Sequence, residues 1–146
     1  MPAPTIDREY LVGTLADLIR INSINPSLVP GAPGEVAIAT SVADRLRWLG
    51  LDVVTLESHP GRPSVIGTLR GAGGGRSLML NAHLDTVGVV GMPDPMTPIV
   101  RNGRMHGRGA YDMKGSLAAC LAAAKARVDA NVALRGNLVL AAVADE

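Results

Sequence analysis

The sequence predicts an α/β fold in which helices lie on both sides of a mixed, mostly parallel sheet, a three-layer αβα arrangement. Helical and strand-like segments alternate along the chain, as they do in layered α/β domains. The continuous apolar segment at residues 138–143 is typical of a strand buried on both faces between helix layers. The 146 residues, 47% of them hydrophobic, are enough for one domain with its own core.

Two amphipathic helices are predicted before the first strand. In residues 7–22, leucine and isoleucine recur at helical spacing, and Thr5 or Asp7 can cap the first turn. A second helix follows a loop rich in proline and glycine, and its apolar positions within residues 39–49 share one face. Gly50 can take the left-handed conformation that ends such a helix.

The remaining elements are predicted from turn residues and apolar runs. Strands are expected at residues 52–57, 65–69 and 77–82. The glycine-rich residues 71–76 form a turn, and Asn102-Gly103 indicates a type I′ hairpin within residues 99–106. Residues 113–130, rich in alanine and leucine, suit a helix that lies close against a sheet.

Composition excludes several classes of partner. A net charge of +1 provides no field to attract nucleic acid or an anionic membrane, and the 2% aromatic content provides no stacking platform for bases. No segment reaches the roughly 18 apolar residues of a membrane span. Cys120, the single cysteine, cannot form an internal disulfide. We therefore expect a soluble, cytoplasmic protein with neither a nucleic-acid nor a membrane partner.

The first motif that can carry chemistry runs from Asn81 to Thr86, where an apolar strand ends. Ligands of α/β proteins commonly bind at the carboxyl ends of strands. His83 and Asp85 are two residues apart, which places both side chains on one face of an extended backbone. Asp85 can then hold the tautomer and ring angle of His83 that a metal ion needs. The alternative is that both are surface polar residues in a turn.

The second motif places Asp112 between a glycine-containing loop and a predicted helix. Gly107 and Gly109 let the backbone pass close to another part of the molecule, and a carboxylate can bridge two metal ions. The alternative is that Asp112 only caps the helix. Lys114 is expected to begin this helix, with its ammonium group in water. A dinucleotide-binding loop is excluded, because Asp112 stands where the third glycine would be and would repel a pyrophosphate.

The third motif is Glu146, which follows the apolar strand at residues 138–143. Its carboxylate is expected at the same edge of the sheet as His83. A bound metal lowers the pKa of water to about 7, so that a carboxylate can accept the proton. Glu146 is therefore a candidate general base, and the alternative is an ordinary solvated acidic residue.

Together the three motifs resemble the M20-type dizinc peptidases and amidohydrolases, a family that includes acetylornithine deacetylase and succinyl-diaminopimelate desuccinylase. Other stretches resemble the family in the same order along the chain. These are Ser23-Ile24-Asn25-Pro26, Asp94-Pro95 and residues 103–109. The resemblance therefore covers essentially the whole chain.

The resemblance implies a role for each motif. His83 would be a ligand of one zinc ion, and Asp112 would bridge two. Asp85 would orient His83, and Glu146 would be the catalytic base. Two zinc ions, or cobalt or manganese in their place, would support hydrolysis of the C–N amide bond of an N-acyl amino acid or dipeptide. Acetylornithine is the best guess for the substrate.

The resemblance also implies that residues 1–146 are the N-terminal part of a zinc-dependent catalytic domain. The lid or dimerisation domain and the remaining catalytic segment of the family are absent, and the complete enzyme would be a homodimer. We therefore expect the isolated chain to bind zinc weakly and to be inactive. The alternative is a non-catalytic fragment or module that associates with a complementary subunit, next to an open sheet edge expected beside residues 138–143.

Overall fold

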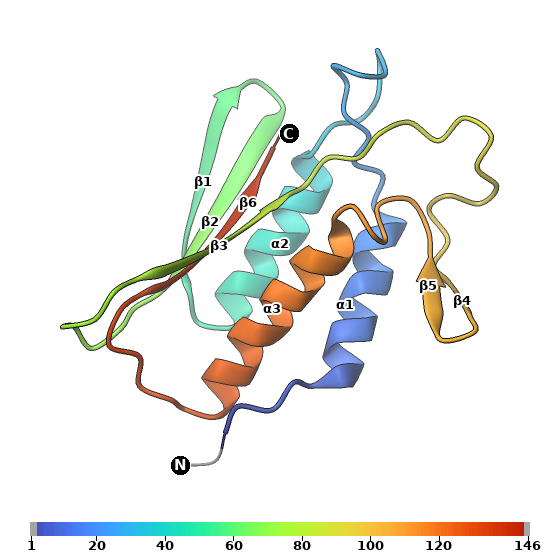
Figure 1. The fold of residues 1–146 in the computed structure, drawn as a ribbon. Helices are drawn as coiled ribbons and strands as arrows, with labels where there is room; N and C mark the ends of the chain where they lie inside the picture. Colours follow the sequence, from blue (N-terminus) through green and yellow to red (C-terminus); the bar gives the residue numbers. More distant parts are fainter. Residues whose placement is uncertain (1–2, 145–146) are drawn as a thin grey trace.

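Residues 3–144 are described by the computed structural model, and they form one main sheet with three helices against one of its faces (Figure 1). The helices are α1 (Arg8–Arg20), α2 (Val36–Trp48) and α3 (Lys114–Asp129). The strands are β1 (Asp52–His59), β2 (Arg62–Leu69), β3 (Leu78–His83), β4 (Ile99–Arg101), β5 (Arg104–His106) and β6 (Leu138–Val143). Each predicted helix and strand is present, and the α/β class is confirmed.

Local signals determine several of the element ends. At the start of α1, the Tyr10 N–H donates a hydrogen bond to the side chain of Asp7 over 3.0 Å, so Asp7 is the cap. Gly50 follows α2 with a φ of +82°, as expected of a C-terminal glycine. Asn102 and Gly103 have φ values of 51° and 73°, which confirms the predicted hairpin turn between β4 and β5.

β6 lies inside the main sheet, whose strand order is β1-β2-β6-β3. It pairs antiparallel with β2 and parallel with β3, while β1 pairs antiparallel with β2. The predicted mixed sheet is confirmed, but for the described strands the prediction of a mostly parallel sheet is wrong. The turn between β1 and β2 is too short for a parallel crossover, so these strands form a hairpin. β2 then continues the antiparallel pairing to β6.

The outer face and one edge of the sheet differ from the prediction. In the described sheet, β1 and β3 each have a partner on one side only, so the open edges lie beside these two strands and not beside β6. The face turned away from the helices carries Val54, Leu56 and Met79, which are 55%, 52% and 61% exposed. The second helix layer of the predicted three-layer arrangement is therefore not among residues 3–144 (Figure 1).

The core fills the space between the sheet and the helices. α2 packs on β1 and β2, α3 packs on β3 and β6, and α1 lies against α3 (Figure 1). The side chains in this cluster with 1% exposure or less include Leu18, Ile38, Val42, Leu46, Val65, Leu84, Leu117, Leu121 and Leu140. One contiguous apolar cluster thus fixes α3 and the end of β3 relative to each other. Within residues 3–144 no helix combines the length and apolar character needed to cross a membrane.

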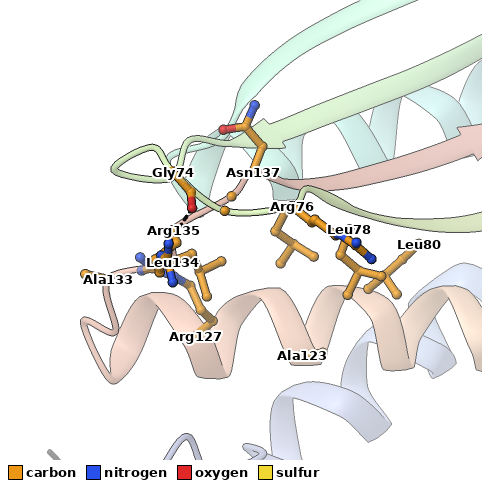
Figure 2. A pocket seen from close by; sticks show the side chains of 13 residues that line it. Gly74, Arg76, Leu78, Leu80, Ala123, Arg127, Ala133, Leu134, Arg135 and Asn137 are labelled. Carbon is orange, nitrogen blue, oxygen red and sulfur yellow. Dashed lines mark hydrogen bonds between the residues drawn. The ribbon is translucent and has the colours of Figure 1, made fainter.

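A pocket of about 870 Å³ opens between β3 and the C-terminal half of α3 (Figure 2). Leu78 and Leu80 line it from the strand, and Ala123 and Arg127 line it from the helix. Arg135 closes one end by donating from Nη2 to the carbonyl oxygen of Gly74 over 2.6 Å. This apolar pocket lies at the amino end of β3, whereas the predicted chemistry lies at the carboxyl end.

Candidate metal centre

His83 is the last residue of β3 and emerges at the carboxyl edge of the sheet. Its ring atom Nδ1 lies 3.0 Å from the backbone carbonyl oxygen of Asp85 and 3.4 Å from Asp85 Oδ1. The His83 side chain is 11% exposed, and that of Asp85 is 5% exposed. The predicted contact between these residues is confirmed. The closer acceptor is the carbonyl oxygen, which the side-chain spacing did not predict.

Asp112 reaches His83 from the loop between β5 and α3. Asp112 Oδ1 lies 2.9 Å from His83 Nε2, and the Asp112 side chain is 72% exposed. The N-cap residue of α3 is Met113, without a side-chain capping hydrogen bond, so Asp112 is not the cap that the alternative interpretation required. The Asp112–Met113 peptide bond is cis. The structure thus brings His83, Asp85 and Asp112 together.

The hydrogen-bonding roles in this cluster suit a divalent cation. Two oxygen acceptors of Asp85 face Nδ1 of His83, which favours a proton on Nδ1 and leaves Nε2 to bind a metal ion when one is present. The carboxylate of Asp112 presents a second lone pair at the same point. In a tetrahedral zinc site, bonds of about 2.0–2.2 Å hold two ligand atoms roughly 3.4 Å apart. His83 Nε2 and Asp112 Oδ1 lie 2.9 Å apart, so a small increase in this distance would let both atoms bind one zinc-like ion.

The loop that carries Asp112 packs closely against two other segments. A Cβ atom on Gly107 would lie 2.4 Å from Ile19 Cγ2, and a Cβ atom on Gly109 would lie 2.8 Å from Thr86 Cγ2. Gly109 also has a φ of +75°, which side chains rarely adopt. The predicted close approach is therefore confirmed, and the approached residues are Ile19 in α1 and Thr86 after β3.

Replacing Gly109 with alanine is expected to destabilise the chain by about 1–3 kcal/mol more than Gly91→Ala, because a methyl group must be forced into a packed site. Gly91 is a matched control: its φ is +77°, and nothing lies within 4 Å of a Cβ atom there. The backbone penalty is thus similar in both variants. Urea unfolding followed by circular dichroism measures the difference. Equal losses of stability would show that the Gly109 contact is unimportant.

Lys114 is buried beside the same loop, so the prediction that its charge lies in water is wrong. Its side chain is 1% exposed, and its Nζ donates to the carbonyl oxygen of Ile21 over 2.7 Å. The lack of a side chain at Gly109 leaves room for the Lys114 side chain, because a Cβ atom on residue 109 would lie 3.1 Å from Lys114 Cδ. Burial lowers the pKa of the Lys114 ammonium group to about 8. The hydrogen bond ties the start of α3 to the end of α1.

One residue of the site was not predicted as functional. Asn25 donates a hydrogen bond from Nδ2 to Asp85 Oδ2 over 2.8 Å, and Asn25 itself is 3% exposed. The sequence identified Asn25 only within a stretch that resembles the family. The feature that could have identified Asn25 is its side-chain amide in the loop after the first helix. An amide that is buried in such a loop needs hydrogen-bond partners, and these would have pointed to a neighbouring segment.

Glu146, the predicted catalytic base, lies outside the described residues, and its placement stays a prediction. Within residues 3–144, no group of three or more His, Cys, Asp or Glu side chains is arranged to hold a metal ion. The described residues therefore supply two donors, His83 and Asp112. A four-coordinate catalytic zinc ion normally has three protein ligands.

Solved structures of several peptidases share this fold. Human carnosine dipeptidase 1 matches with a TM-score of 0.80 at 22% sequence identity, over 93% of this chain and 32% of its own. Aminopeptidase PepT from Bacillus cereus matches with a TM-score of 0.75 at 20% identity, over 95% of this chain and 37% of its own. The chain thus has the fold of a class of peptidases.

Sequence comparisons give the family. Residues 79–146 match the profile of Peptidase family M20/M25/M40. N-formyl-4-amino-5-aminomethyl-2-methylpyrimidine deformylase from Bacillus subtilis is 37% identical over 123 residues, which are 80% of this chain and 29% of the relative. Succinyl-diaminopimelate desuccinylase from Leptothrix cholodnii is 34% identical over 78% of this chain and 32% of the relative. Residues 79–146 thus carry the sequence pattern of peptidase family M20/M25/M40, and the chain spans about a third of these relatives' length.

Proposed function

We propose that this protein is a metal-dependent hydrolase that cleaves the C–N amide bond of a small N-acylated amine. The observation that carries the proposal is the contact between His83 Nε2 and Asp112 Oδ1 at 2.9 Å, with Nδ1 of the same ring held by Asp85. An imidazole nitrogen and a carboxylate oxygen thus meet at the carboxyl edge of the sheet. Both are donor types that zinc binds, and they would supply two of its ligands.

Each residue has a defined task in this proposal. His83 and Asp112 would hold the metal, which would be zinc or, in its place, cobalt or manganese, and Asp112 would also be available to a second ion. Asp85 keeps the Nδ1 proton of His83 in place, so that Nε2 stays unprotonated. When bound, the metal acidifies water and polarises the amide carbonyl. Glu146 accepts the proton of the water and passes it to the leaving nitrogen.

The names of two relatives support a proposal for the substrate class. One is named as a deformylase of an aminomethylpyrimidine and another as a desuccinylase of diaminopimelate. Both names describe removal of a small acyl group from an amine. We therefore widen the initial proposal of acetylornithine to N-formyl, N-acetyl and N-succinyl amines, and we propose a cytoplasmic homodimer as the working form.

The proposal is tested with the complete protein that contains residues 1–146, because the described residues supply only two metal donors and the isolated chain is expected to be inactive. The protein is loaded with zinc and incubated with a panel of N-formyl, N-acetyl and N-succinyl amines. Release of the free amine is measured with an amine-reactive dye. We expect turnover of at least one acyl class, inhibition by a chelator, and recovery when zinc is added back. Absence of turnover across the panel, together with absence of zinc binding, would overturn the proposal.

The second candidate is a non-catalytic module that binds a complementary subunit. The exposed apolar side chains Val54 and Leu56 on β1 and Met79 on β3 favour it, since exposed apolar residues on an open sheet face are often covered in a complete assembly. This candidate predicts a stable complex without metal-dependent turnover. The panel above, combined with size-exclusion chromatography, separates the two functions.

A further inference from the structure

We infer that Asn25 is a positioning residue of the metal centre, which acts on His83 through Asp85. The link to a metal rests on the proposed function, whereas the link to the His83 ring rests on contacts in the structure. Asn25 belongs to the loop after α1, and Asp85 follows β3. The side-chain amide of Asn25 in the first segment therefore holds the carboxylate of Asp85 in the second.

The contact between Asn25 and Asp85 is buried and has a defined direction. Asn25 Nδ2 donates to Asp85 Oδ2 over 2.8 Å, and the two residues are 3% and 5% exposed. The backbone N–H of Ser27 donates to Asn25 Oδ1 over 2.8 Å. Because Oδ1 accepts from Ser27, the NH₂ group must face the carboxylate. The amide thus has one orientation only.

The backbone holds Asn25 in place opposite the segment that follows β3. The Asn25 N–H donates to the carbonyl oxygen of Thr86 over 2.9 Å, and the Thr86 N–H donates to the carbonyl oxygen of Ser23 over 2.9 Å. Ile24 and Thr86 form a parallel bridge between these hydrogen bonds. These backbone hydrogen bonds join the Asn25 segment to Thr86, the residue next to Asp85, and so fix the position of the Asn25 amide.

The two oxygens of Asp85 have different tasks. Oδ2 accepts from Asn25, while Oδ1 lies 3.4 Å from His83 Nδ1. Without the amide, Oδ2 would be buried without that donor, which costs more than a lost surface hydrogen bond. Rotation of the carboxylate toward another donor would then relieve the cost. Such a rotation moves Oδ1 away from the histidine ring, so that Nδ1 loses this acceptor and keeps the backbone carbonyl oxygen of Asp85.

The test variant is Asn25→Ser, because a serine hydroxyl can still accept from the Ser27 N–H but is too short to reach Asp85. Asn25→Ala is the second variant. The matched control is Asn22→Ser: Asn22 is exposed, and its Oδ1 accepts from the Ile24 N–H in a similar local turn. All three are made in the full chain and compared by thermal unfolding.

The first measurement is the tautomer of His83 in the metal-free protein, read from imidazole ¹⁵N shifts at an alkaline pH where the ring is neutral. We expect the share of the Nε2-protonated form to be higher in Asn25→Ser than in the parent, and Asn22→Ser to match the parent. The second measurement is zinc affinity by competition with a chelator. We expect a loss of roughly 10-fold, at the lower end of the range for groups that support metal ligands.

A double-mutant cycle shows whether Asn25 acts through Asp85. In an Asp85→Ala background, Asn25→Ser should cause no further loss of zinc affinity, because coupled residues are not additive. An unchanged tautomer in folded Asn25→Ser and Asn25→Ala, or an undiminished effect in the Asp85→Ala background, would overturn the inference. The tautomer readout needs neither metal nor turnover, so failure of the proposed function leaves it interpretable.

Discussion

Replacing Asp112 with asparagine is expected to lower amide hydrolysis by about 1000-fold or more and to weaken zinc binding in parallel. The substitution keeps the size of the side chain but removes the negative charge that a bridging ligand supplies. Metal stabilisation of a transition state is worth several kcal/mol, and each 1.36 kcal/mol changes a rate about tenfold. The rate is measured on the acyl class that the substrate panel identifies, and zinc affinity is measured by chelator competition.

Asp44→Asn is the matched control for this prediction. The Asp44 side chain is 68% exposed, close to the 72% of Asp112, and it pairs with Arg47 on the surface of α2. We expect this variant to keep the parent rate within about twofold. An Asp112→Asn protein that retained the parent rate and the parent zinc affinity would remove Asp112 from the metal centre.

Replacing Arg62 with methionine is expected to lower the free energy of unfolding by about 3–5 kcal/mol. Arg62 holds the carboxylate of Glu35 with two hydrogen bonds, from Nε over 2.5 Å and from Nη2 over 2.7 Å. The Glu35 side chain is 0% exposed. Removal of the guanidinium therefore leaves a buried carboxylate without its partner at the start of α2. Urea unfolding followed by circular dichroism gives the free energy.

Arg70→Met provides the comparison at the other end of β2. Arg70 pairs with Asp52 at 2.7 Å, but the two side chains are 77% and 61% exposed. Exposed pairs contribute roughly 0–1 kcal/mol, so we expect little change. Equal effects of Arg62→Met and Arg70→Met would mean that burial does not determine the strength of the Glu35 pair.

Local elements of this fold were predictable because their signals are local. Asp7 caps α1, Gly50 ends α2, and Asn102-Gly103 turns the β4–β5 hairpin, each through a backbone preference of the residue itself. β6 was predicted with its observed bounds, because its apolar run is six residues long, which is typical of a buried strand and too short for an ordinary helix. These predictions needed no knowledge of the tertiary structure.

The order of the strands was not predictable in the same way. Pairing of β6 between β2 and β3 depends on contacts between segments distant in the chain, and the apolar pattern of each strand is compatible with other neighbours. The burial of Lys114 was not predictable for the same reason, because it also depends on contacts with residues distant in the chain. Its ammonium group is accommodated by the carbonyl oxygen of Ile21 and by the space at Gly109, neither of which is adjacent in sequence.

The candidate site was predicted in part. The spacing of His83 and Asp85 and the loop position of Asp112 indicated their residue types and their place at the sheet edge, and the structure brings all three together. The hydrogen bond from Asn25 to Asp85 was missed, because it joins two loops whose proximity results from the packing of α1. The role of Glu146 stays a prediction that follows from the family resemblance.

Because β6 is the last described strand and lies inside the sheet, the sheet cannot close during translation until Val143 has left the ribosome. Before that point β1 and β2 are an isolated hairpin, which is weakly stable by itself, and β3 has no neighbour. The apolar faces of α2 and α3 remain open to chaperones and proteases in that interval. Formation of the described sheet therefore depends on residues 138–143, and a chain truncated before Leu138 cannot join β2 to β3.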